Sequence, residues 1–154
     1  MKSRRTEKKN RRRNKTLRGG LKKKHSARII SNTKIVQNFI QMLNTVKLYH
    51  WKTRSYAQHK ATDELYERLN DNIDKFVEIL LGKDESRIKM TEKNIQLIDA
   101  SNTSDIKAQV YAYREFLINL SETFSAKRDT DLLNVRDELL GDINQFLYLL
   151  TLDE

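Results

Sequence analysis

The sequence contains no cysteine and no proline, and only four of its 154 residues are glycine. Without cysteine there can be no disulfide, no thiolate metal site and no thiol nucleophile. Because helix breakers are so scarce, the periodic apolar segments described below predict an all-α protein. No apolar run approaches the length of a membrane span, so we expect no membrane partner. The charged start of the chain has no apolar segment after it, so we expect no secretory signal.

Charge is divided unevenly along the chain. Residues 1–28 hold 14 Lys or Arg and a single acid, Glu7, whereas residues 29–154 hold 16 bases and 20 acids. The first segment therefore carries a formal charge of +13 and the second −4. The first segment has too few apolar residues to repay the entropy of ordering. We predict a disordered basic arm, 1–28, attached to one mildly acidic helical domain, 29–154.

The arm has the composition of a polyanion-binding segment. Such runs neutralise phosphates and release counterions, which makes binding sensitive to salt and indifferent to base sequence. The arm has no aromatic residue, so base stacking is not expected. We predict nonspecific binding to DNA, or to RNA, while a solubilising tail and a nuclear localisation signal remain alternative interpretations. The residues predicted to contact nucleic acid are Lys2, Arg4, Arg5, Lys8, Lys9, Arg11, Arg12, Arg13, Lys15, Arg18, Lys22, Lys23, Lys24 and Arg28.

The remainder of the chain holds four long amphipathic segments. Each repeats apolar residues at helical spacing, over about 33–55, 60–82, 104–126 and 129–152. Gly82 is expected as a C-terminal cap of the second helix, and Thr103 or Ser104 as the N-terminal cap of the third. Short links make the first two helices, and the last two, antiparallel hairpins.

The link between the second and third helices, about 83–103, is long enough to cross the bundle. Within it we predict a short helix, with Ile88, Ile95, Leu97 and Ile98 as its apolar anchors. A four-helix bundle with one long crossover is the ferritin-like topology. The predicted fold is therefore an all-α, ferritin-like bundle.

The candidate metal ligands lie in the segment 48–78. It holds two of the three histidines in the chain, and the sequence runs His50-Trp51, His59, Asp63, Asp74, Glu78. Imidazoles and carboxylates suit iron. On a helix the last four residues fall within an arc of about 100°, but the two pairs lie roughly 22 Å apart along the axis. One helix therefore cannot bring them to one metal, whereas a second, antiparallel copy can, with two identical sites per dimer.

His50, near the end of the first helix, lies close to His59 in the hairpin and is expected to join it. The alternative interpretation of these carboxylates is a solvated helix face.

These residues resemble the Dps family, the mini-ferritins that bind DNA and oxidise iron. The resemblance is specific over 48–81 and extends through helix order to most of 33–152. It implies a dinuclear ferroxidase site in which His50, His59 and Asp63 come from one subunit, and Asp74 and Glu78 from its partner. It places Trp51 beside the site as an oxidisable aromatic. The alternative interpretation of Trp51, which is compatible with the first, is a packing residue of the hairpin. The resemblance also implies a homo-oligomeric shell, a dodecamer in that family, in a cytoplasmic location associated with DNA or the nucleoid.

Two features depart from the family pattern. The interval from His50 to His59 is shorter than usual, and Arg54-Ser55-Tyr56 stands where the family turn carries glycine. A shorter hairpin predicts a shifted position of His50 relative to His59. An alternative function is therefore a non-catalytic DNA-packaging or virion structural protein, found in the nucleus or a virion interior. In that case the helical domain serves only as an oligomerisation hub.

Overall fold

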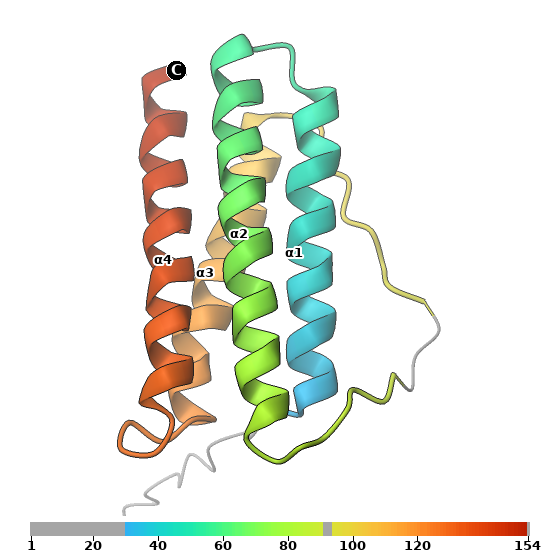
Figure 1. Cartoon of the computed structure of the whole chain (residues 1–154). Coiled ribbons are helices and arrows are strands. Elements are labelled where there is room, and N and C mark those ends of the chain that lie inside the picture. Colours follow the sequence, from blue (N-terminus) through green and yellow to red (C-terminus); the bar gives the residue numbers. More distant parts are fainter. Residues whose placement is uncertain (1–29, 91–93, 154) are drawn as a thin grey trace, which may run out of the picture.

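The computed structural model describes residues 30–90 and 94–153, which form four long α-helices and two short 3-10 turns (Figure 1). The predicted all-α four-helix bundle is confirmed, and these residues contain no strand. The predicted arm, 1–28, lies outside the described residues. The helices are α1 (Asn32–Lys52), α2 (Tyr56–Gly82), α3 (Thr103–Asn119) and α4 (Thr130–Leu150), with 3-10 turns η1 (Leu120–Glu122) and η2 (Thr151–Asp153).

The helices run up, down, down and up, because the link after α2 returns along the whole bundle before α3 begins (Figure 1). In this order α1 packs on α2 and α3, and α4 packs on α2 and α3. Each of these neighbouring pairs is antiparallel. The ends of α1 and the starts of α2 and α3 therefore meet at one end of the bundle. None of the helices in the described ranges is long and apolar enough to cross a membrane.

The crossover differs from the prediction. Its described residues, 83–90 and 94–102, contain no helix. The reason is that the segment lies along α1 and gives its carbonyls to α1 side chains: the Thr33 hydroxyl donates to Lys89 O at 3.1 Å and the Gln41 amide to Gln96 O at 2.9 Å. A carbonyl held in this way is turned away from a helical partner. The expected anchors are only half-buried or, for Leu97, 56% exposed, so little apolar burial favours a helix here.

Two expected caps also differ. The side chain of Asn102, not Thr103 or Ser104, caps α3 by accepting from the Asp105 backbone N–H at 2.9 Å. Gly82 is the last residue of α2 and has no positive φ, so it does not act as a left-handed cap. The turn beyond it uses Glu85, at φ 53°, as the left-handed residue. A glutamate therefore occupies the backbone conformation that usually favours glycine.

The core has two chemically distinct ends. Where α2 finishes, aromatic rings pack edge to face: the Phe39 ring centroid lies 5.2 Å from that of Phe76 and 5.8 Å from that of Phe116. Where α1 finishes, buried polar groups pair, with the Tyr49 hydroxyl donating to the Gln58 amide oxygen at 2.5 Å. Buried polar groups are costly unless they are paired, so these bonds restrict how the helices can pack at the polar end.

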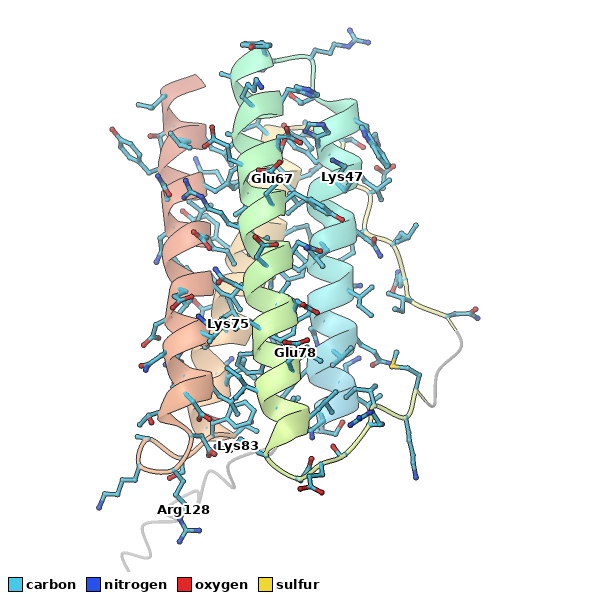
Figure 2. All side chains as sticks on the ribbon, viewed as in Figure 1. Lys47, Glu67, Lys75, Glu78, Lys83 and Arg128 are labelled. Carbon is cyan, nitrogen blue, oxygen red and sulfur yellow. The ribbon has the colours of Figure 1, made fainter. Side chains whose placement is uncertain are left out.

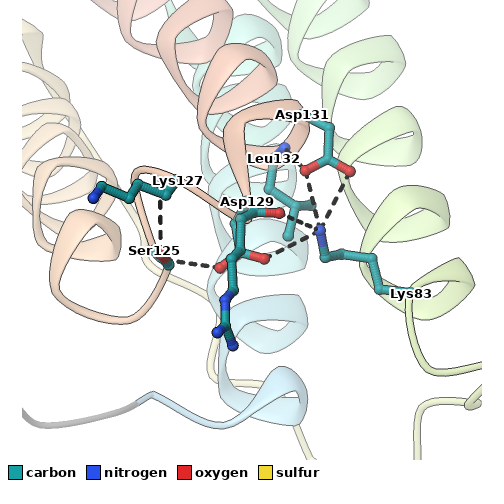
Figure 3. Close-up of polar contacts among 7 residues, drawn as sticks. Lys83, Ser125, Lys127, Asp129, Asp131 and Leu132 are labelled. Carbon is teal, nitrogen blue, oxygen red and sulfur yellow. Dashed lines mark hydrogen bonds and ion pairs between the residues drawn. The ribbon is translucent and has the colours of Figure 1, made fainter.

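A polar clamp joins the end of α2 to the start of α4 (Figure 3). The Lys83 ammonium pairs with Asp129 Oδ1 at 3.1 Å and with Asp131 Oδ1 at 3.2 Å. Two hydrogen bonds lower the pKa of Asp129 below its ordinary value of 3.8. The larger effect comes from the backbone N–H of Ser125 and the smaller from the Lys83 ammonium. The backbone N–H of Leu132 likewise lowers the pKa of Asp131, and the bond to Asp129 raises the pKa of Lys83 above 10.5.

These shifts predict a pH window for the clamp. The carboxylates have lowered pKa values, so their stabilisation is present above about pH 4 and is lost as the pH falls through the folded values. Lys83 has a raised pKa, so its stabilisation is present below about pH 10.5 and is lost as the pH rises through the folded value. We expect Lys83→Met to lower the Tm by about 1–3 °C at neutral pH, because exposed pairs contribute little.

Thermal melts from acidic to neutral pH check this prediction. The difference in Tm between the wild type and Lys83→Met should become smaller below about pH 4. Lys127→Met, in the loop before α4 that also holds Asp129, is the control for losing one positive charge. If the difference in Tm is the same at acidic and neutral pH, Lys83 stabilises the fold through packing of its methylene groups and not through its charge.

Candidate metal centre

The α1–α2 hairpin brings two histidines into contact. His50 lies in the last turn of α1 and His59 in the first turn of α2, with only residues 53–55 between the helices. Ser55 starts α2 by accepting the Gln58 backbone N–H at 3.2 Å. The imidazole rings stack, with centroids 3.9 Å apart and an interplanar angle of 24°. The short hairpin therefore places His50 directly against His59, as the sequence predicted for this pair.

Each imidazole is fixed by the backbone of the other histidine. His50 Nδ1 lies 3.0 Å from the His59 carbonyl oxygen, and His59 Nδ1 lies 3.1 Å from the His50 carbonyl oxygen. A carbonyl oxygen only accepts, so both Nδ1 atoms must carry the proton. In the neutral rings both Nε2 atoms then hold a lone pair. Such Nδ1–H donation to a carbonyl is the usual way that a metal-binding histidine is oriented.

Asp63 lies one helical turn after His59 and faces His50. Its Oδ1 is 3.7 Å from His50 Nε2. Metal–ligand bonds of about 2.1 Å place neighbouring ligands roughly 3.0–3.6 Å apart, so a small movement brings these two atoms to one ion. The same oxygen is 3.7 Å from the Lys47 ammonium, which lies 4.8 Å from the Tyr66 ring centroid and 5.8 Å from that of Trp51.

Asp74 and Glu78 lie elsewhere on α2. Both are exposed, and they follow Asp63 by 11 and 15 residues, which is about 16 and 22 Å along the helix axis. Figure 2 shows the separation, with Lys47 at the hairpin end of the bundle and Glu78 toward the opposite end. Within residues 30–90 and 94–153 of one chain, no three His, Asp or Glu side chains lie close enough together to hold a metal. One chain therefore carries two separate parts of the predicted ligand set.

Trp51 is beside the hairpin and 69% exposed, so it is not a buried packing residue of the hairpin in one chain. Its ring is one of the two that flank the Lys47 ammonium. An exposed indole at this position is available to a partner surface.

Two residues near the centre were not identified from the sequence. Lys47 stands three residues before His50, on the same face of α1, and this spacing was a usable signal. Thr62 is 0% exposed and its hydroxyl lies 3.3 Å from His50 Nδ1. A threonine at an otherwise apolar helix position was also a signal, but the partner of its hydroxyl is fixed only by how α1 packs on α2.

A family model described as "Family of unknown function (DUF5856)" matches residues 50–150, about two thirds of the chain. The chain belongs to the DUF5856 family. The match begins at His50 and includes His59, Asp63, Asp74 and Glu78, so all five predicted ligands lie within the matched residues. The basic arm and most of α1 lie outside it. No curated protein and no solved structure matches the chain.

Proposed function

We propose that this DUF5856 protein is a Dps-like mini-ferritin that binds and oxidises iron at dinuclear sites shared between two copies. The observation that carries the proposal is the reciprocal bonding of the two histidines. It holds two Nε2 lone pairs ready at the hairpin, one of them 3.7 Å from the Asp63 carboxylate. The up-down-down-up order with one long crossover adds support, since ferritin-like folds share it.

The spacing along α2 supports a shared site. His59 and Glu78 lie equally far on either side of the point between Arg68 and Leu69, and so do Asp63 and Asp74. A twofold axis through that point, with two α2 helices antiparallel, would set His59 level with the partner's Glu78 and Asp63 level with the partner's Asp74. A single twofold axis therefore pairs all four proposed ligands, and the dimer would contain two identical sites.

The same register avoids a repulsive contact. Glu67 is exposed on this face near the middle of α2 (Figure 2). With the axis between Arg68 and Leu69, Glu67 is level with the partner's Asn70, which is neutral. Like charges directly opposed across an interface cost free energy. Among the α2 acids, this register sets only Asp63 level with an acid, the partner's Asp74, and a bound metal would offset that repulsion.

Fe(II) is the substrate of the proposed reaction. Carboxylate oxygens stabilise Fe(III) relative to Fe(II), which lowers the reduction potential of the bound pair and favours oxidation. One hydrogen peroxide takes one electron from each of two Fe(II) ions and two protons from solvent, giving two Fe(III) and two waters. Oxygen is the alternative oxidant. The protein supplies the oriented imidazoles and the charge that holds both ions together.

The arm completes the proposal. Residues 1–28 carry a formal +13, and many copies on one particle would bind DNA, or RNA, through avidity. By its resemblance to Dps the particle is a homo-oligomer, a dodecamer in that family, located with the DNA in the cytoplasm.

A second candidate is the non-catalytic hub, a DNA-packaging or virion protein that uses the helical domain only to assemble. One observation favours it. The Lys47 ammonium already pairs with Asp63 Oδ1, so a metal must displace a resident positive charge. If that displacement is too costly, the carboxylates remain a solvated face and only the arm functions.

Peroxide consumption by the wild-type assembly tests the proposal. Under anaerobic loading with Fe(II), we expect hydrogen peroxide to disappear at about half the molar amount of Fe(II), and faster than with iron in buffer. Light scattering should show a particle far larger than the 18.3 kDa chain. A large particle without accelerated iron oxidation favours the hub. A folded monomer at high concentration rules out the shared site.

A further inference from the structure

Thr62 is a polar residue at a core position of α2. It is 0% exposed and lies between His59 and Asp63 in the sequence, facing α1. The next buried positions along the same face are Leu65 and Leu69. A β-branched polar residue is a poor choice for helix propensity or for apolar burial alone. Its hydroxyl therefore needs a specific partner.

The hydroxyl has three neighbours, and their chemistry fixes its proton. Its Oγ1 lies 2.8 Å from the Gln58 carbonyl oxygen and 3.0 Å from the His59 carbonyl oxygen. Both carbonyls only accept, so the hydroxyl donates its single proton to them. Its lone pairs then face His50 Nδ1 at 3.3 Å. The contact can form only if Nδ1 is the donor, which agrees with its bond to the His59 carbonyl.

We propose that Thr62 is a positioning residue that holds the His50 imidazole in the Nδ1–H tautomer, with the Nε2 lone pair directed toward Asp63. Without the hydroxyl, the Nδ1–H retains only the His59 carbonyl, which α2 also uses in its own helical hydrogen bonding. The ring would then be held by one shared acceptor instead of two, which makes tautomer exchange or rotation easier. The consequence for metal binding rests on the function proposed above, whereas the tautomer does not.

The test uses Thr62→Val, which keeps the shape and removes the hydroxyl, with Thr62→Ser as the variant that restores it. Long-range nitrogen–proton NMR spectra of the full-length, metal-free assembly report the tautomer of each histidine, and His50→Gln assigns the signal. We expect His50 in the wild type and in Thr62→Ser to be the Nδ1–H form alone. In Thr62→Val a second, Nε2–H population should appear.

Zn(II) binding, measured with the metal alone, gives the second readout. Removing a group that orients a metal-binding histidine typically lowers affinity by about 10–100-fold, so we expect at least a tenfold loss in Thr62→Val and recovery in Thr62→Ser. If Thr62→Val does not fold, Thr62→Ala takes its place in both measurements.

The outcomes separate the two proposals. An Nε2–H form of His50 in the wild type, or identical His50 spectra in wild type and Thr62→Val, overturns the role of Thr62. If the spectra differ as expected but the wild type binds no Zn(II), Thr62 positions His50 and the metal-binding function fails.

Discussion

Changing Asp74 to Asn should lower the rate of peroxide-driven iron oxidation by roughly 100-fold or more while leaving the particle assembled. The substitution keeps the side-chain volume and removes the negative charge of one of the five proposed ligands. Loss of even an outer, orienting group costs about 10–100-fold in metal affinity, so loss of a direct ligand should cost more. Asp74 is exposed on α2, so the fold of the chain does not depend on it. Stopped-flow peroxide assays and particle mass give the two readouts.

Asp71→Asn is the matched control. It removes the same charge from an exposed position of α2 one turn earlier, but it is outside the predicted ligand set. Near wild-type oxidation by Asp71→Asn shows that the loss in Asp74→Asn is local and is not a general effect of weaker acidic attraction for Fe(II). Equal losses in the two variants would count against Asp74 as a ligand.

Mixed assemblies test whether the ligands come from two chains. His59→Ala and Asp74→Asn each damage every site when alone. When the two chains pair, one site of the dimer collects both lesions and the other site has none. Random mixing makes about half of the dimers mixed, so about a quarter of all sites should be intact. Recovery near a quarter of wild-type activity supports the shared site, and mixed particles as inactive as both parents exclude it.

The sequence predicts the four helices because each carries an apolar stripe that only a bundle can bury. Helix ends agree within four residues, since cap chemistry is local, except that α3 ends at Asn119 instead of near 126 and a 3-10 turn follows it. The crossover is where this reasoning was wrong. Its apolar anchors Ile88 and Ile95 satisfy a helical spacing, but the Thr33 and Gln41 side chains of α1 take carbonyls at Lys89 and Gln96 instead. That competition depends on which surface the segment lies against, and no local pattern contains it.

In the candidate centre too, some features could be predicted from the sequence and others could not. The proximity of His50 to His59 follows from a short hairpin, and the separation of Asp63 from Asp74 follows from helix rise, so both were predictable. The ring stacking, the exchanged Nδ1 bonds and the Lys47–Asp63 pair depend on the rotation of α1 against α2. Those details require the packed structure. They also limit the site, because a metal at Asp63 competes with the Lys47 ammonium.

Deleting residues 1–28 should abolish binding to duplex DNA and leave iron oxidation and assembly unchanged. The deleted segment holds 14 Lys or Arg and one acid, whereas the remaining domain has a formal charge of −4. For the full-length protein, 6–10 phosphate contacts would lower affinity by about 10³–10⁵-fold between 50 and 200 mM salt. Fluorescence anisotropy with a labelled duplex of arbitrary sequence, repeated across salt concentrations, measures the affinity for DNA and its dependence on salt.

Two replacement arms make this prediction specific. An arm with the same residues in shuffled order should bind DNA as tightly as the natural one, because phosphate neutralisation depends on charge and not on order. A Gly/Ser arm of the same length should not bind, which separates charge from length. Binding that survives the deletion would place the nucleic-acid surface on the helical domain. Binding lost on shuffling would show that the arm recognises DNA through a defined structure, and the electrostatic account would then be wrong.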